Sequence, residues 1–161
     1  LPSEGRYWGK GALDLPPTGE IAVYPMSTKD EIVLRTPDAL LNGQGIVDVI
    51  HSCCPEIKNA WEMPGIDVDA VLVGIRIATY GNSMTFSSQC PHCKGENEHD
   101  VDLSNILSSI ECPNFSDLIT YKDLKIKLKP QYYFNVNKAN MIGACAKIGK
   151  QEANGFVLCS L

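Results

Sequence analysis

The sequence predicts an α+β fold in which a small helical half packs against a β-hairpin. Three observations lead to this expectation. One stretch has the periodicity of an amphipathic helix, two strand-like segments flank a C-x2-C turn, and the first residues are broken repeatedly by Pro and Gly. The 161 residues suffice for one domain. We expect an extended N-terminal arm over residues 1–26 and a single α+β domain over residues 27–161, with the hairpin at about residues 82–103.

The N-terminal arm cannot fold alone, because its Pro and Gly residues interrupt any helix. Tyr7 and Trp8 are apolar anchors within it. Such an arm docks either on its own domain or on a partner protein, and the sequence leaves both alternatives open. On the second alternative, Tyr7 and Trp8 are partner-binding residues.

Helices are expected next along the chain. Thr28 and Glu31 have the spacing of a capping box, and Pro37 ends this first helix and begins another. A short apolar helix follows over residues 46–50. The clearest helix spans residues 67–80, where apolar residues form one continuous face, with Asp67 as its cap. Arg76 stands on the polar side of this helix and is either a surface residue, an ion-pair partner of Asp67 or Asp69, or a contact to another protein.

Strands are expected on both sides of the C-x2-C turn, over residues 84–89 and 98–102, followed by a short helix over residues 103–110. Residues 122–129 alternate apolar and Lys side chains, which predicts one further strand. Asn137 can cap a final helix. The Lys side chains of residues 122–129 are typical of the solvated face of an edge strand.

Cys90 and Cys93 can bind one metal ion from a tight turn, because the two intervening residues let both sulfur atoms point the same way. A structural zinc ion needs four ligands, and the best second pair is Cys53 and Cys54. The other candidates near a cysteine are His51, His92, His99 and Cys112. The competing interpretation is that Cys90 and Cys93 are free thiols on a hairpin turn.

The composition argues against several functions. The net charge of −5 disfavours a protein that binds the phosphate backbone of nucleic acids. No apolar run is long enough to span a bilayer. The seven cysteines, an odd number, favour a reducing compartment. Phosphate-binding loops, the H-E-x-x-H zinc motif and the deaminase zinc pattern do not occur. We therefore expect no enzymatic activity and no nucleic-acid, membrane or small-molecule partner.

Several segments, taken in order, resemble the T4-type bacteriophage baseplate-hub protein family of contractile-tailed phages. The matching segments are Leu1-Pro2-Ser3, Pro25-Met26-Ser27-Thr28-Lys29 with Glu31, Cys53, Val71-Leu72-Val73-Gly74-Ile75-Arg76-Ile77-Ala78-Thr79-Tyr80-Gly81, Cys90-Pro91-His92-Cys93 and Val101-Asp102-Leu103. Lys94 departs from such knuckles, which often place Gly immediately after the second Cys.

The resemblance implies a non-enzymatic hub component, or a factor that assists hub assembly, acting by protein–protein docking. Its partners would be other baseplate and tail proteins. It would be assembled in the host cytoplasm and would be located in the tail baseplate of the virion. The hairpin would be zinc-ribbon-like, with Cys90, Cys93 and Cys53 carried over as ligands. The alternative function is a zinc-ribbon adaptor in transcription or nucleic-acid handling, which should carry a basic face.

Overall fold

The computed structural model describes the backbone of residues 1–149 and the side chains of residues 1–143. Within these residues the chain is α+β, as expected, and both of its sheets are two-stranded antiparallel hairpins. The elements in chain order are α1 (Thr28–Leu34), α2 (Pro37–Leu41), α3 (Gln44–Cys53), the 3-10 helix η1 (Ala60–Glu62), α4 (Gly65–Tyr80), β1 (Ser83–Gln89), β2 (Glu96–Asp102), α5 (Leu103–Ser109), β3 (Leu118–Tyr121), β4 (Leu124–Lys127) and α6 (Tyr133–Gly149).

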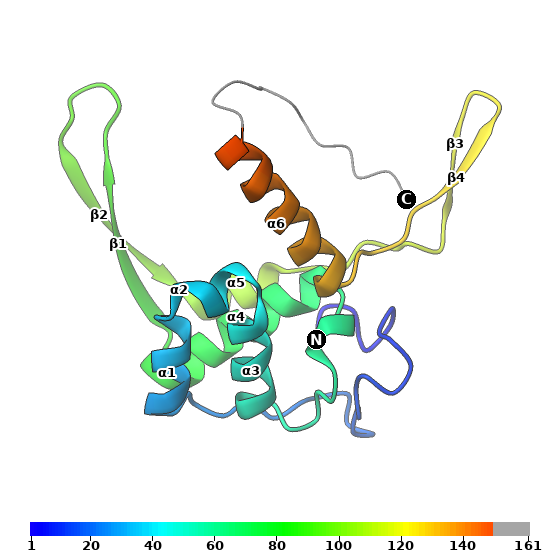
Figure 1. The fold of residues 1–161 in the computed structure, drawn as a ribbon, viewed down its shortest axis with the longest axis horizontal. Helices are drawn as coiled ribbons and strands as arrows, with labels where there is room; N and C mark the ends of the chain where they lie inside the picture. The colour runs from blue at the N-terminus through cyan, green and yellow to red at the C-terminus, as the bar shows by residue number, and fades with distance from the viewer. Residues whose placement is uncertain (150–161) are drawn as a thin grey trace.

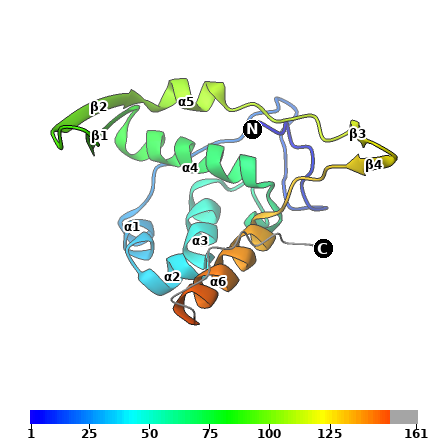
Figure 2. The same cartoon turned by 90° about the horizontal axis from the view of Figure 1, so that it is seen from above.

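The helices form the body, and the two hairpins project from it at opposite ends (Figures 1 and 2). The expectation that the helical half packs against the knuckle hairpin is therefore wrong. Every residue of β1 is exposed, and so is every residue of β3 and β4. The second hairpin also corrects the prediction of one strand over residues 122–129. That segment instead contains the turn and the second strand of a pair.

The hydrophobic core lies between α3 and α4 and is completed by the loop that joins them. Val47 and Ile50 of α3 meet Val68, Val71 and Ile75 of α4. Each fully buried aliphatic side chain of this size stabilises the fold by roughly 1.5–3 kcal/mol. Since the apolar residues of both helices recur every three or four positions, the faces that they bury were visible in the sequence. Among the described helices, none is long and apolar enough to cross a membrane.

The starts of α1 and α4 differ from the sequence expectation. The capping box of α1 is formed by Ser27 and Asp30, one residue before the predicted pair. Ser27 N–H donates to the Asp30 carboxylate over 2.8 Å, and Asp30 N–H donates back to the Ser27 hydroxyl over 3.4 Å. Helix α4 begins at Gly65, so Asp67 lies inside its first turn and is not its cap.

Helix α6 begins at Tyr133, four residues before the expected cap Asn137. Its start is fixed by the preceding segment, where Tyr133 N–H donates to the Met63 carbonyl over 2.8 Å. The Tyr133 ring also stacks on Trp61 with centroids 5.4 Å apart. The apolar positions 145 and 148, expected on this helix, lie outside the residues whose side chains the structure describes.

The N-terminal arm, residues 1–26, forms neither helix nor strand, begins with a series of turns, and runs along the core. It is joined to the loop after α3 by an isolated bridge between Leu13 and Ile57. The adjacent backbone hydrogen bonds run from Asp14 N–H to the Glu56 carbonyl, at 2.9 Å, and from Lys58 N–H to the Ala12 carbonyl, at 2.8 Å. Of the two alternatives for the arm, the structure thus shows docking on its own domain.

Candidate functional site

A buried carboxylate at the start of α4 holds the N-terminal arm. Asp67 is fully buried and accepts a hydrogen bond from Ser3 N–H over 2.9 Å and another from the Ser3 hydroxyl. Trp8 Nε1 donates to the same carboxylate over 2.6 Å. Trp8 was one of the expected partner-binding residues. Its indole N–H instead forms a hydrogen bond within the chain. A buried carboxylate needs donors of this kind to offset its lost hydration.

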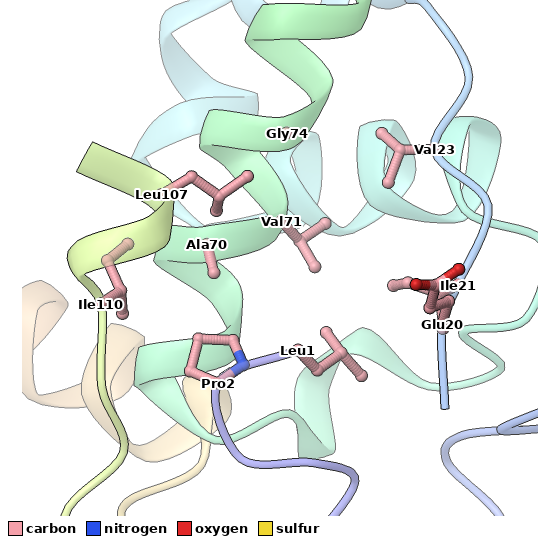
Figure 3. A pocket seen from close by; sticks show the side chains of 10 residues that line it. All are labelled: Leu1, Pro2, Glu20, Ile21, Val23, Ala70, Val71, Gly74, Leu107 and Ile110. Atoms are coloured by element: carbon pink, nitrogen blue, oxygen red, sulfur yellow. The ribbon is translucent and has the colours of Figure 1, made fainter. Parts of the chain in front are cut away.

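The arm, α4 and α5 enclose an open groove of about 460 Å³. Ala70, Val71 and Gly74 of α4 line its inner side, as Figure 3 shows. Leu107 and Ile110 border one side, and the arm borders the rest with Leu1, Pro2, Glu20, Ile21 and Val23. Among the lining side chains only Glu20 is charged, and the groove bears no cluster of groups suited to acid–base or nucleophilic chemistry.

The β1–β2 hairpin has one acidic and one partly apolar face. Strand pairing sets Asp100 opposite Thr85 and Glu98 opposite Ser87, and because side chains alternate, Glu96 and Asp102 share that face. On the other face Phe86 lies opposite His99, with ring centroids 5.3 Å apart. Met84 lies opposite Val101 on the same face. Phe86 and Met84 are both exposed, so this face has little cover among the described residues.

The C-x2-C segment forms the tip of the β1–β2 hairpin. Cys90 N–H donates to the Gly95 carbonyl over 2.9 Å, and Lys94 N–H donates to the Cys90 carbonyl over 3.0 Å. Hydrogen bonds from the backbone N–H groups of Cys93 and His92, and from the Cys93 thiol, hold the pKa of Cys90 below its usual range. Lys94 has a φ of 59°, the left-handed conformation that Gly adopts most easily. The turn keeps this geometry although Lys stands where Gly was expected.

The four cysteines expected to share a metal ion do not come together. Cys53 and Cys54 are buried in the core at the end of α3, whereas Cys90 and Cys93 lie at the projecting tip (Figure 1). Burial raises the pKa of the Cys54 thiol to about 12, with smaller contributions from Cys53 and Glu56, so it is a core thiol and a poor ligand. Among the described residues no three His, Cys, Asp or Glu side chains form a group that could hold a metal ion. The residues present do not fit the predicted site.

The remaining metal candidates have other contacts. His51 Nε2 accepts a hydrogen bond from Ala60 N–H over 3.1 Å. His99 lies within 3.1 Å of the Ser88 hydroxyl, and the Cys112 thiol donates to the Pro113 carbonyl over 3.5 Å. His92 belongs to the exposed tip itself. None of these side chains completes a site with Cys90 and Cys93 in the part of the chain that the structure describes.

The β3–β4 hairpin has a continuous apolar face and a basic face. Ile119 pairs with Ile126, and Tyr121 pairs with Leu124, so these four side chains share one face. The opposite face carries Lys125 and Lys127, which pair with Thr120 and Leu118. Sequence reasoning found the Lys stripe and the alternating apolar residues of β4, but it did not identify β3, which completes the apolar face.

Tyr7 and Arg76, the other expected partner-binding residues, both make intramolecular contacts. The Tyr7 ring meets Phe115 edge-on with centroids 5.4 Å apart, at the base of the β3–β4 hairpin, and lines a shallow groove there. The Arg76 guanidinium lies over the Tyr80 ring, 4.5 Å from its centroid. Among the described residues Arg76 forms no ion pair with Asp67 or Asp69, which corrects that alternative.

Comparison with known proteins identifies a family. A sequence model of the family described as T4 bacteriophage base plate protein matches residues 12–150. No curated protein and no solved structure gives a significant match. The family match covers the helical body and both hairpins, far more than half of the chain, and it agrees with the resemblance found in the sequence. The chain belongs to the T4 bacteriophage base plate protein family, whose members are structural components of the phage tail baseplate.

Proposed function

We propose that this baseplate protein is a non-enzymatic component of the hub, or a factor that assists hub assembly, and that it acts by docking on other baseplate proteins through its projecting hairpins. The hub assignment rests on the sequence resemblance, and the family match supports a baseplate role in general. Assembly in the host cytoplasm is part of the same proposal. Nucleic acids, membranes and small molecules are not among the proposed partners.

The observation that carries this proposal is the apolar face of the β3–β4 hairpin, which is exposed in the part of the chain whose side chains the structure describes. Leu124 is 64% exposed and Tyr121 is 60% exposed. Both lie on the apolar face of the hairpin, and in most sheets the apolar face is packed against other parts of the protein. Ile119 and Ile126 are exposed beside them. A two-stranded hairpin is marginally stable in water unless a third strand or another surface covers it. Contiguous exposed apolar side chains of this kind mark interaction sites.

The chemistry of the hairpin defines the kind of partner. Its free strand edges can accept a strand from another chain, and its apolar face can pack on an apolar surface. Lys125 and Lys127 on the opposite face favour acidic side chains at the rim of that surface. We therefore propose a neighbouring baseplate subunit that presents an apolar surface bordered by Asp and Glu. Tyr7 lies at the base of this hairpin and remains a proposed contact, whereas Trp8 holds the arm.

Co-purification from cells that also express the hub proteins of the same phage tests this proposal. The variant Tyr121→Ser with Leu124→Ser removes apolar surface from one face, and Leu118→Ser with Thr120→Ser is the matched control on the other. We expect the first variant to lose most of the co-purified hub protein and the control to keep it. Since both pairs lie on the projecting hairpin, the unfolding temperature of the body should stay unchanged in each. Undiminished co-purification with the first variant would rule the apolar face out.

A further inference from the structure

The two hairpins share one architecture and carry opposite charges. β2 carries four carboxylates on one face, because its acidic residues occupy alternate positions. β4 carries Lys125 and Lys127 on one face. Each sheet contains only two strands, so in the described part of the chain the outer edges of β2 and β4 have no strand partner. Backbone N–H and C=O groups along these edges are therefore open to a strand of another molecule.

Charge decides which of these edges can pair. Charged side chains on an edge strand protect it from pairing with its own kind. Two β2 edges would set carboxylate beside carboxylate, and two β4 edges would set Lys beside Lys, which destabilises a strand pair. A β2 edge beside a β4 edge instead sets opposite charges together. The same side chains thus exclude the like pairs and favour the unlike pair.

The unlike pair must join two molecules, because the hairpins project from opposite ends of one body (Figures 1 and 2). We propose that β2 of one copy pairs edge to edge with β4 of a second copy, so that the two hairpins form one four-stranded sheet. The inference rests on the proposed docking function of the hairpins and names a second copy of this chain as the partner. An antiparallel pairing sets Lys125 opposite Asp100 and Lys127 opposite Glu98.

This register also matches the apolar faces of the two hairpins. Alternation sets Leu124 opposite Val101, with Ile126 on the same face. Parallel pairing of the same charges would set Leu124 opposite the polar Asn97, and an antiparallel shift in one direction would set Ile126 opposite Asn97. A shift in the other direction would bring Leu124 to Leu103, which lies outside β2 and is buried. The register with Leu124 opposite Val101 therefore gives one continuous apolar face and one face of paired charges.

Pairing of this kind is head to tail, since each copy offers β2 at one end and β4 at the other. Head-to-tail contacts repeat, and they generate a ring when the rotation closes or a row when it does not. One such contact is small, because β4 has only four residues. Small interfaces are weak one at a time, and repetition strengthens them through avidity. The purified chain should therefore associate reversibly and to a greater extent at higher concentration.

Sedimentation velocity of the purified full chain, at concentrations up to about 1 mM, tests the inference. We expect the average mass to rise above the 17.6 kDa of one chain as the concentration increases. Lys125→Glu with Lys127→Glu puts carboxylates on both edges at the paired positions, and Glu98→Lys with Asp100→Lys puts Lys on both. Each variant alone should associate at least about tenfold more weakly than the parent chain. An equimolar mixture of the two should associate as the parent chain does, because each contact again joins opposite charges.

Lys10→Glu with Lys29→Glu is the matched control for the lysine reversal, since it changes the net charge by the same amount at exposed positions outside the hairpins. We expect this control to associate as the parent chain does, and the unfolding temperature of every variant to stay unchanged. A parent chain that stays monomeric over the whole concentration range, or a charge-reversed variant that still associates alone, would overturn the inference. A mixture of the two reversed chains that stays monomeric would also overturn it.

These experiments separate the failure of this inference from the failure of the proposed function. The proposed function fails when Tyr121→Ser with Leu124→Ser leaves co-purification with hub proteins undiminished. The pairing of copies fails when the mixture of charge-reversed chains, in the absence of any hub protein, stays monomeric. Since either result can occur without the other, each failure can be identified.

Discussion

Trp8 Nε1 lies 2.6 Å from a carboxylate oxygen of Asp67, and this contact joins two residues 59 positions apart in the chain. Ser3 donates to the same carboxylate from its backbone and its side chain. The buried Asp67 side chain at the start of α4 depends on the arm for its hydrogen bonds, and the arm depends on that side chain for its position. This relationship explains why an arm without helix or strand is held against the core.

Replacing Asp67 should release the arm. We expect Asp67→Ala to lower the free energy of unfolding by about 2–4 kcal/mol, because three donors lose their acceptor in a buried place. Urea denaturation measures this change, and limited proteolysis should show earlier cleavage within residues 1–26. Asp69→Ala is the matched control, since Asp69 is exposed on the same helix and its removal should change stability by less than about 0.5 kcal/mol. Equal losses in the two variants would contradict the anchoring role.

The core and tip cysteines should differ in their reactivity toward alkylating reagents. Burial raises the pKa of Cys54 to about 12, whereas hydrogen bonds from the Cys93 and His92 backbone lower that of Cys90. At pH 8 the folded, metal-free protein should therefore be alkylated at Cys90 at least about tenfold faster than at Cys54. Peptide mass mapping after timed iodoacetamide treatment gives the rate at each site. Rates that differ in the folded protein and become equal only on adding urea would support the burial argument, and equal rates without urea would refute it.

Asp30 should contribute to loss of stability in acid. Burial alone would raise the pKa of this carboxyl, but hydrogen bonds from the side chain and backbone of Ser27 and from Ser52 outweigh it and lower the pKa below 3.8. Its stabilising effect is thus present above pH 3.8 and is lost as the pH falls through the lower folded value.

Urea unfolding of the Asp30→Asn variant across this pH range tests the effect. The variant should be less stable than the parent protein at pH 7 and should lose less stability between pH 5 and about pH 2.5. Ser52→Ala, which removes one donor, should give an intermediate pH dependence. Parallel curves for the parent and Asp30→Asn would show that this carboxyl does not cause the acid sensitivity.

Gly43 lies between α2 and α3, next to Asn137 of α6. Its φ is 75°, and a Cβ atom there would lie 2.7 Å from Cγ of Asn137. Gly43→Ala should lower the free energy of unfolding by about 2–3 kcal/mol, from backbone strain and displacement of Asn137. Gly11→Ala is the control for strain alone, since Gly11 has a φ of 77° and no atom within 4 Å of the added Cβ.

A double-mutant cycle separates the two contributions at Gly43. Asn137→Ala in the Gly43→Ala background should recover part of the loss, because the displaced side chain is gone. The loss that remains should match that of Gly11→Ala to within about 0.5 kcal/mol. Thermal unfolding of the four variants provides the measurement, and strict additivity would show that Asn137 is not displaced.

Local patterns predicted the elements whose causes are local. The helix expected at residues 67–80 is α4, because its apolar face is read directly from the spacing of Val68, Val71 and Ile75. The hairpin expected at about residues 82–103 is present because Gly95 and the C-x2-C segment mark its turn. The second hairpin was missed, since its turn residues Lys122 and Asp123 lack the usual Asn-Gly signal and Lys122 adopts a φ of 55°.

The contacts that define the sites join distant parts of the chain and leave no local pattern. Nothing near Asp67 in the sequence indicates that its donors are Ser3 and Trp8, so it was taken for a helix cap. Likewise the spacing of Cys53, Cys54, Cys90 and Cys93 says nothing of their separation in space. Pairing two cysteine pairs was an assumption about tertiary structure, and the burial of the first pair decides against it.

The acidic β2 face and the basic β4 face lie on hairpins at opposite ends of the body, which gives the protein an electric dipole moment along its long axis (Figure 1). In the field of a charged neighbour such a molecule experiences a torque before any surfaces touch. At physiological ionic strength this torque acts within about 8 Å, the Debye length. A charged surface that comes this close would therefore favour one orientation of the protein, with the basic hairpin toward negative charge.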